Sequence, residues 1–160
     1  TRLRPLTLNI PKCLIPVQER PLMSYWFRIF ERSDVDTILI NLSYLAEKVE
    51  TFVEEQSVNF KIELVFEEKL LGSLGTTLQN FEFFVEEKSI VIAYADNFTN
   101  LNLQNMIDFH HSHGCLATVT AVQPPGRFGA LLLDGESVMG FSEKPRGDGG
   151  LVNGGCAQFP

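Results

Sequence analysis

The chain has 160 residues, 44% of them apolar, which is enough to bury the core of one medium-sized domain. Its net charge of −7 argues against a nucleic-acid binder, because a phosphate backbone is held mainly through Lys and Arg and repels an acidic surface. The three cysteines are widely spaced and form no CxxC pair, and no apolar run reaches the roughly 18 residues of a membrane span. We therefore expect a cytoplasmic protein with no membrane segment.

The first half of the chain alternates predicted helices and strands. Apolar residues recur every three or four positions from Pro21 to Arg32, which predicts an amphipathic helix. DTILINL (36–42) and FKIELVF (60–66) read as strands, and the first of them is short and β-branched, as in a strand buried on both faces. A helix between them turns four apolar residues inward: Leu45, Val49, Phe52 and Val53.

The second half continues this alternation and then changes. A helix is predicted from about Leu74 to Phe84, a buried strand at 89–95, and a helix from Asn102 to His113 that Gly114 ends. Alternation of this kind predicts an α/β fold with a mostly parallel sheet and helices on both faces. LATVTAV, GALLL and VMGFSEK then predict strands that extend the sheet in mixed or antiparallel pairs, the last two joined by a tight Asp-Gly turn.

Asp96 stands where a ligand site is expected in such a sheet, just after the strand at 89–95. A carboxylate at a strand end suits Mg²⁺, which takes one or two carboxylates and completes its octahedron with phosphate oxygens and water. The plain alternative is that Asp96 and Asn97 form only a turn or a helix cap.

Three other stretches allow both a plain and a functional interpretation. LLGSLGTT places Gly72 and Gly75 before a helix, where backbone N–H groups could approach a ligand, but it matches neither GxGxxG nor GxxxxGK[ST] and on its own indicates a plain turn. GFSEKPRGDGG places Glu143 and Lys144 at a strand end, where charged residues are usually only solvated. Gly129 lies in PPGRFGAL, whose prolines and glycines are typical of a turn.

The histidines His110, His111 and His113 raise a metal hypothesis that the surrounding residues do not favour. His110 lies on the apolar stripe of its predicted helix, and no nearby carboxylate or cysteine completes a ligand set. Basic side chains are in any case favourable near a helix C-terminus. A serine nucleophile is not indicated either, because no GxSxG elbow is present.

Taken in order, TRLRPLT with a following PK, then YADN, FSEKP and NGG resemble the sugar-1-phosphate nucleotidyltransferase family over nearly the whole chain. PPGRFGAL and EKPRGDGGLVNGG look most like glucose-1-phosphate cytidylyltransferases, whereas LLGSLGTT and ADN look more like mannose-1-phosphate guanylyltransferases. The resemblance implies a Rossmann-like nucleotidyltransferase fold over residues 1–160. Neither the base nor the sugar is fixed by these motifs.

The family resemblance also implies a reaction and roles for particular residues. A sugar 1-phosphate would attack the α-phosphorus of a nucleoside triphosphate with Mg²⁺ as cofactor, giving a nucleotide-sugar and pyrophosphate. Arg2 and Lys12 would hold the triphosphate, Gly72 and Gly75 would line the nucleotide site, and Asp96 would bind Mg²⁺. The sugar phosphate would be held by four residues: Gly129, Glu143, Lys144 and Asn153.

The chain departs from the family pattern at both ends. The family's first strand and most of its glycine-rich loop precede TRL, and here Thr1 is the first residue, so we expect that strand to be missing and its neighbours to have unpaired edges. A second metal-binding aspartate is expected beyond residue 160. Unpaired edges favour a homo-oligomer. The alternative function is a non-catalytic module that binds nucleotide-sugars or sugar phosphates on the same scaffold.

Overall fold

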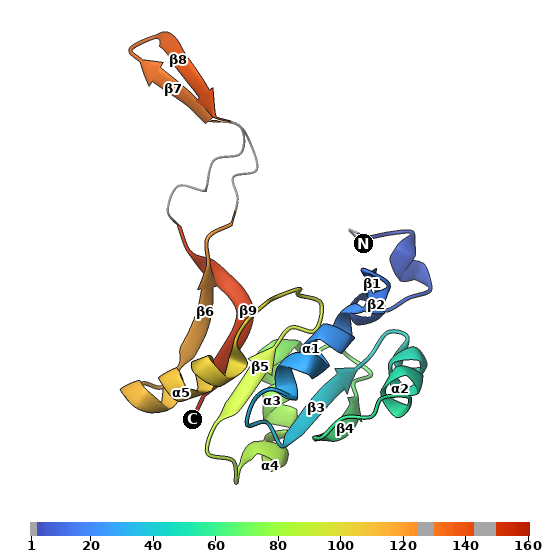
Figure 1. Cartoon of the computed structure of the whole chain (residues 1–160). Coiled ribbons are helices and arrows are strands. Elements are labelled where there is room, and N and C mark those ends of the chain that lie inside the picture. Colours follow the sequence, from blue (N-terminus) through green and yellow to red (C-terminus); the bar gives the residue numbers. More distant parts are fainter. Residues whose placement is uncertain (1–2, 125–129, 143–149) are drawn as a thin grey trace.

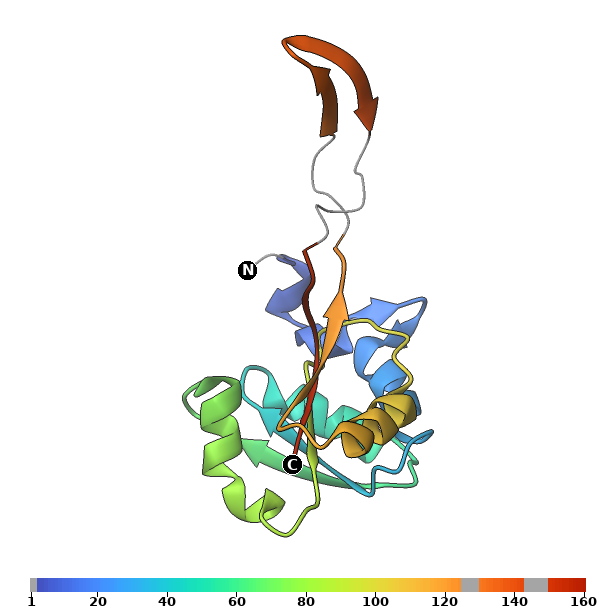
Figure 2. The same cartoon turned by 90° about the vertical axis from the view of Figure 1, so that its left-hand side faces the viewer.

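The computed structural model describes residues 3–124, 130–142 and 150–160. It is a mixed α/β structure in which helices lie on both sides of the strands (Figures 1 and 2). Three helices and three strands follow the short N-terminal turns and pack together: α1 Leu22–Phe30, β3 Thr37–Leu42, α2 Ala46–Glu54, β4 Lys61–Phe66, β5 Ile90–Ala93 and α5 Leu103–His113. Each lies within a few residues of its predicted place.

The remaining elements are shorter or lie toward the C-terminus. The N-terminal ones are η1 Leu6–Leu8, η2 Lys12–Leu14, β1 Pro16–Val17 and β2 Arg20–Pro21. The later ones are α3 Gly72–Gln79, α4 Phe81–Phe84, β6 Thr118–Val122, β7 Ala130–Asp134, β8 Ser137–Ser142 and β9 Val152–Phe159. The predicted tight turn between β7 and β8 is confirmed, with Gly135 at φ 58°.

The strand pairings do not confirm the mostly parallel sheet that the alternation predicts. β3 and β4 pair in parallel, with Thr37 opposite Lys61, whereas β9 lies between β5 and β6 and is antiparallel to both. β1 pairs with β2 and β7 with β8, again antiparallel. Within the described ranges no ladder joins β3 to β5, so the two main sheets have facing edges that are not hydrogen-bonded to each other.

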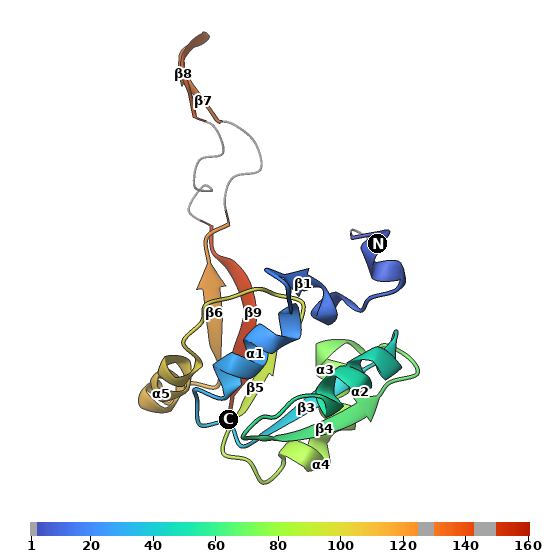
Figure 3. The same cartoon turned by 45° about the vertical axis from the view of Figure 1, so that its right-hand side comes forward.

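Helix α1 connects these two sheets through its apolar face. Figures 1 and 3 show it lying between the β3–β4 pair and the β5–β9–β6 sheet. Met23 and Phe27 pack with residues of β3, β4 and α2, whereas Trp26 packs with Leu103 of α5 and Cys156 of β9. Helices α3 and α4 lie on the other side of the strands from α1 and α5 (Figure 2). The core of the domain therefore depends on α1.

The helix predicted from about Leu74 to Phe84 is present, but as two helices rather than one. Helix α3 begins two residues earlier, at Gly72, and the segment is divided at Asn80 into α3 and α4. The side-chain amide of Asn80 donates to the Thr76 carbonyl oxygen at 2.9 Å. A side chain that bonds a carbonyl of the preceding turn competes with continuation of the helix, which explains the division.

Two of the three histidines near the end of α5, His110 and His113, hydrogen-bond to one threonine. His110 Nδ1 lies 2.9 Å and His113 Nε2 2.7 Å from Thr118 Oγ1, and the backbone N–H of Cys115 donates to His113 Nδ1. Burial lowers the pKa of His110, and its two histidine neighbours act in the same direction. Among the residues described, no three His, Cys, Asp or Glu side chains could hold a metal ion. The histidines thus fasten α5 to β6.

No helix of the described chain is sufficiently long and apolar to cross a membrane.

Candidate functional site

Asp96 lies in a short turn after β5 that is fastened from two sides. The Tyr94 N–H donates to the Gly155 carbonyl oxygen at 2.9 Å, and the Asn97 side chain donates to the Gly154 carbonyl oxygen at 3.3 Å. From the other side, Trp26 Nε1 donates to the Asn97 carbonyl oxygen at 2.9 Å. The turn is therefore fixed by β9 and by α1, while Asp96 remains exposed.

Lys12 meets Asp96 across this turn. Lys12 Nζ and Asp96 Oδ2 are 3.5 Å apart, and the two side chains are 51% and 47% exposed. Burial raises the pKa of the neighbouring Cys13 thiol to about 11, and the Asp96 carboxylate acts in the same direction. An ion pair this exposed contributes only about 0–1 kcal/mol to stability, so its partners are free to bind a ligand. The predicted neighbourhood of Lys12 and Asp96 is present.

The NGG motif of β9 packs directly against the YADN motif. Gly155 has φ 88°, and a Cβ atom there would lie 1.8 Å from Asn97 Nδ2, so a larger residue would be strained and would displace the Asn97 side chain. Asn153 is exposed, and its Oδ1 accepts a hydrogen bond from the Gly155 N–H at 2.8 Å. Asn153, one of the predicted site residues, therefore lies on β9, the strand that supports the Asp96 turn.

The two predicted glycines, Gly72 and Gly75, lie within α3 and not in a loop before it. Gly72 has φ 71°, and no atom lies within 4 Å of a Cβ placed there. A Cβ on Gly75 would lie 2.6 Å from Leu71 Cβ, so the close packing of Leu71 accounts for that glycine. Ser73 Oγ donates to Tyr94 Oη at 3.4 Å, which connects the start of α3 to the Asp96 turn.

Glu67 is a buried carboxylate that positions the start of α3. Its side chain accepts hydrogen bonds from Thr76 Oγ1 at 2.5 Å and, more weakly, from the Leu71 N–H at 3.4 Å. These bonds, led by the one from Thr76 and joined by one from Asn41, hold the pKa of the Glu67 carboxyl below its usual value. Residue 67 is only 3% exposed, so its negative charge is stabilised by fixed donors rather than by water.

We expect Glu67→Gln to destabilise the protein at neutral pH and to reduce its sensitivity to acid. Because the pKa of Glu67 is lower in the folded state, its contribution is complete above about pH 5.5 and is lost as pH falls below the unfolded value of about 4.5. The free energy of unfolding from urea titrations at several pH values measures this effect. Equal losses in the two proteins between about pH 5.5 and pH 3.5 would contradict it.

The structure unites part of the predicted site. Lys12, Asp96 and the NGG segment come together, and α3 with Gly72 joins them through Ser73 and Tyr94. Four predicted residues lie outside the described ranges: Arg2, Gly129, Glu143 and Lys144.

Sequence reasoning did not find two supporting residues, Trp26 and Glu67. Trp26 was visible only as one member of an apolar helix face, although a tryptophan carries a donor that needs a partner when it is buried. Glu67 was visible only as a charged residue directly after a strand. The missing signals are the hydrogen bond from Trp26 to Asn97, far along the chain, and the bonds that Glu67 accepts from Thr76 and Leu71.

The comparisons with known proteins agree on one family. The family model described as nucleotidyl transferase matches residues 1–156. A Sulfolobus acidocaldarius protein with the provisional name mannose-1-phosphate guanyltransferase is 36% identical over 99% of this chain and 45% of its own length. A Salmonella typhi glucose-1-phosphate cytidylyltransferase is 45% identical over 46% of this chain and 29% of its own length. This chain spans less than half the length of these curated relatives.

Solved structures share the fold. A crystal structure of HddC from Yersinia pseudotuberculosis complexed with GMP-PN matches with a TM-score of 0.73 and 23% identity, covering 99% of this chain and 71% of that one. At this level of identity the likeness concerns the arrangement of helices and strands.

Proposed function

This chain belongs to the nucleotidyl transferase family, and from that we propose that the whole protein transfers a nucleotidyl group from a nucleoside triphosphate to a sugar 1-phosphate. The products are a nucleotide-sugar and pyrophosphate. The observation that carries the proposal is the exposed Lys12–Asp96 pair at 3.5 Å, held where α1, β5 and β9 meet.

The chemistry requires charge and position rather than a base. An oxygen of the sugar phosphate forms a bond to the α-phosphorus, and the bond from that phosphorus to the β-phosphate oxygen breaks, so pyrophosphate leaves with the electron pair. The attacking phosphate is already anionic, and the main obstacle is the repulsion between two polyanions. The positive charge of Lys12 would lower that repulsion at the triphosphate. By family resemblance, the charges of Arg2 and Lys144 would lower it further.

Asp96 fits Mg²⁺ by the chemistry of its donors. Its carboxylate is half-exposed, and the turn that carries it is held through neighbouring residues, so both oxygens can face a ligand. Mg²⁺ commonly binds one or two carboxylates and takes its other ligands from phosphates and water. When bound, the ion would neutralise charge on the phosphates. A second carboxylate would come from outside the described residues.

The other site residues follow the family resemblance. Gly72 and Gly75 would line the nucleotide site at the start of α3, and Gly129, Glu143 and Asn153 would contact the sugar. We also propose that β3 and β5 belong to one mostly parallel mixed sheet, completed by a strand between their facing edges, and that the protein is cytoplasmic. Unless that strand is present, these edges favour homo-oligomers.

Calorimetry and turnover of the whole protein test the proposal. We expect a nucleoside triphosphate to bind with Mg²⁺ and pyrophosphate to form when the matching sugar 1-phosphate is added. A panel of all common triphosphates and several sugar phosphates identifies the base and the sugar. Binding in the absence of turnover across the panel would favour the alternative of a non-catalytic regulatory or binding module. The absence of any binding would contradict both.

A further inference from the structure

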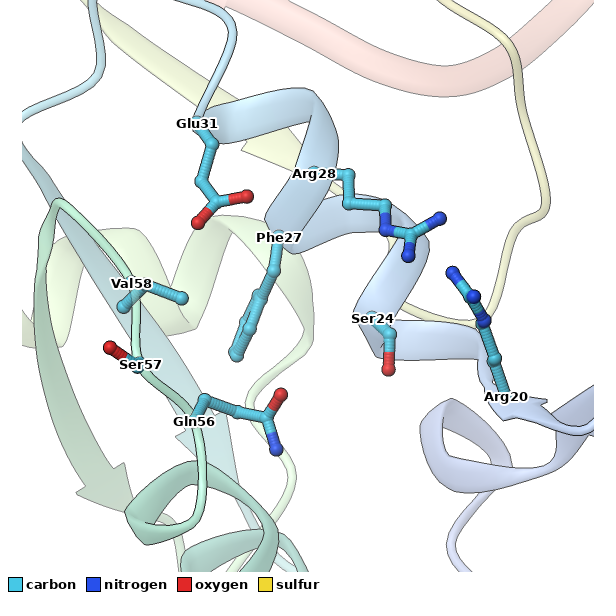
Figure 4. A pocket seen from close by; sticks show the side chains of 8 residues that line it. All are labelled: Arg20, Ser24, Phe27, Arg28, Glu31, Gln56, Ser57 and Val58. Carbon is cyan, nitrogen blue, oxygen red and sulfur yellow. The ribbon is translucent and has the colours of Figure 1, made fainter.

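A pocket of about 230 Å³ beside α1 holds two arginine side chains face to face (Figure 4). Arg20 comes from β2 and Arg28 from α1, and Figure 4 shows their guanidinium groups directed toward each other. Among residues 3–124, 130–142 and 150–160, no carboxylate lies within ion-pair distance of either arginine. Two cations placed in this way repel each other, and an anion between them would remove that repulsion.

The opposite end of the pocket presents hydrogen-bond acceptors. Gln56 Nε2 donates to the Phe52 carbonyl oxygen at 3.0 Å, and Figure 4 shows Gln56 Oε1 turned into the pocket. The Glu31 carboxylate also lies away from Arg20, and Figure 4 shows the ring of Phe27 between Glu31 and Gln56. The pocket therefore offers charged donors to one end of a ligand and acceptors to the other.

We propose that this pocket binds a small phosphate monoester that carries hydroxyl groups. Arginine guanidinium groups match phosphate oxygens in charge and geometry. Gln56 and Glu31 would accept hydrogen bonds from the hydroxyl groups of the ligand. The volume lies below the roughly 300–1,000 Å³ of pockets for drug-sized ligands, which favours a ligand about the size of glycerol 3-phosphate.

The pocket shares no lining residue with the Lys12–Asp96 site, so the two can be separated experimentally. Phe27, however, belongs to an apolar cluster against which Cys13 and Leu14 pack, and these two residues directly follow Lys12. A ligand seated against α1 would thus contact the helix that supports Lys12. The site is suited to regulation of the domain by a small phosphate ester.

Calorimetry with glycerol 3-phosphate, inorganic phosphate and glycerol at fixed ionic strength tests the proposal. We expect the ester to bind more tightly than inorganic phosphate and glycerol not to bind. Arg20→Gln or Arg28→Gln should each weaken binding of the ester by about tenfold, the loss expected for one hydrogen bond between charged groups. Arg32→Gln, with the same change of charge just after α1 but outside the pocket, should leave the affinity unchanged.

Two further variants separate this site from its alternatives. Lys12→Gln should retain binding of the ester, whereas loss of binding in that variant would assign the ligand to the Lys12–Asp96 site instead. Glu31→Gln should change the affinity little, because glutamine keeps an acceptor for a hydroxyl group. Equal affinity in the double variant Arg20→Gln/Arg28→Gln and in the unchanged protein would overturn the proposal, as would equal affinities for the ester and for inorganic phosphate.

Discussion

Replacing Asp96 with asparagine is expected to remove the benefit of Mg²⁺ for nucleotide binding and to lower turnover of the whole protein by about 10²- to 10³-fold. Asparagine keeps the size of the side chain but loses the negative charge that would hold the cation. The free energy of unfolding should change by only about 0–1 kcal/mol, because the carboxylate and its ion-pair partner Lys12 are both about half-exposed.

Triphosphate binding to Asp96→Asn should also be measured without metal, in EDTA. Without Asp96, the Lys12 ammonium group has lost the carboxylate at 3.5 Å, so a triphosphate should bind at least as tightly in EDTA as it binds the unchanged protein. Calorimetry with and without Mg²⁺ therefore separates loss of a metal ligand from damage to the site. Asp36→Asn, an exposed carboxylate that precedes β3, is the matched control. An unchanged Mg²⁺ dependence in Asp96→Asn would assign the cation to other residues.

The elements that the sequence predicts well are those whose signals are local. Helix α1 and strands β3 and β4 follow from the spacing of apolar residues within each segment, and Gly114 ends α5 at φ 65° as its position predicts. Burial of one face is the main requirement for each of these elements, and periodicity reports burial directly.

The pairing of strands could not be predicted in the same way. β9 lies between β5 and β6, which end at Ala93 and Val122, well before β9 begins at Val152, and nothing in its own pattern selects those partners. The alternation of strands and helices predicts parallel neighbours, but that rule does not apply to a late strand that enters the sheet in the opposite direction. The sheet order depends on long-range contacts, which local patterns do not contain.

The candidate site shows the same division. Lys12 and Asp96 were found because a motif and a strand end mark them. Trp26 and Glu67 act instead through hydrogen bonds to Asn97 and Thr76, and the sequence does not show that these residues come together. A buried indole and a buried carboxylate look like ordinary core and surface residues in a sequence. Their partners become visible only when the chain is folded.

Trp26→Ala is expected to lower the free energy of unfolding by about 3–5 kcal/mol, the range for removing a large aromatic side chain from a core. Trp26 is 3% exposed and packs with Leu103, Met106 and Cys156, which come from α5 and β9. Removing it leaves a cavity where α1, α5 and the β5–β9–β6 sheet meet. Urea unfolding followed by circular dichroism measures the loss, since the variant has no tryptophan fluorescence.

Trp26→Phe separates packing from the hydrogen bond that supports the site. Phenylalanine fills part of the space but leaves the Asn97 carbonyl oxygen without the indole donor at 2.9 Å, a loss of about 1–3 kcal/mol. Tyr25→Phe is the matched control, because it removes one side-chain hydrogen bond from the same helix, to the Val17 carbonyl oxygen. Both variants should lose stability, but only Trp26→Phe should also weaken Mg²⁺-dependent nucleotide binding, because, of these two side chains, only Trp26 hydrogen-bonds to the Asp96 turn. Equal nucleotide affinities in the two variants would show that the turn is held well enough by β9 alone.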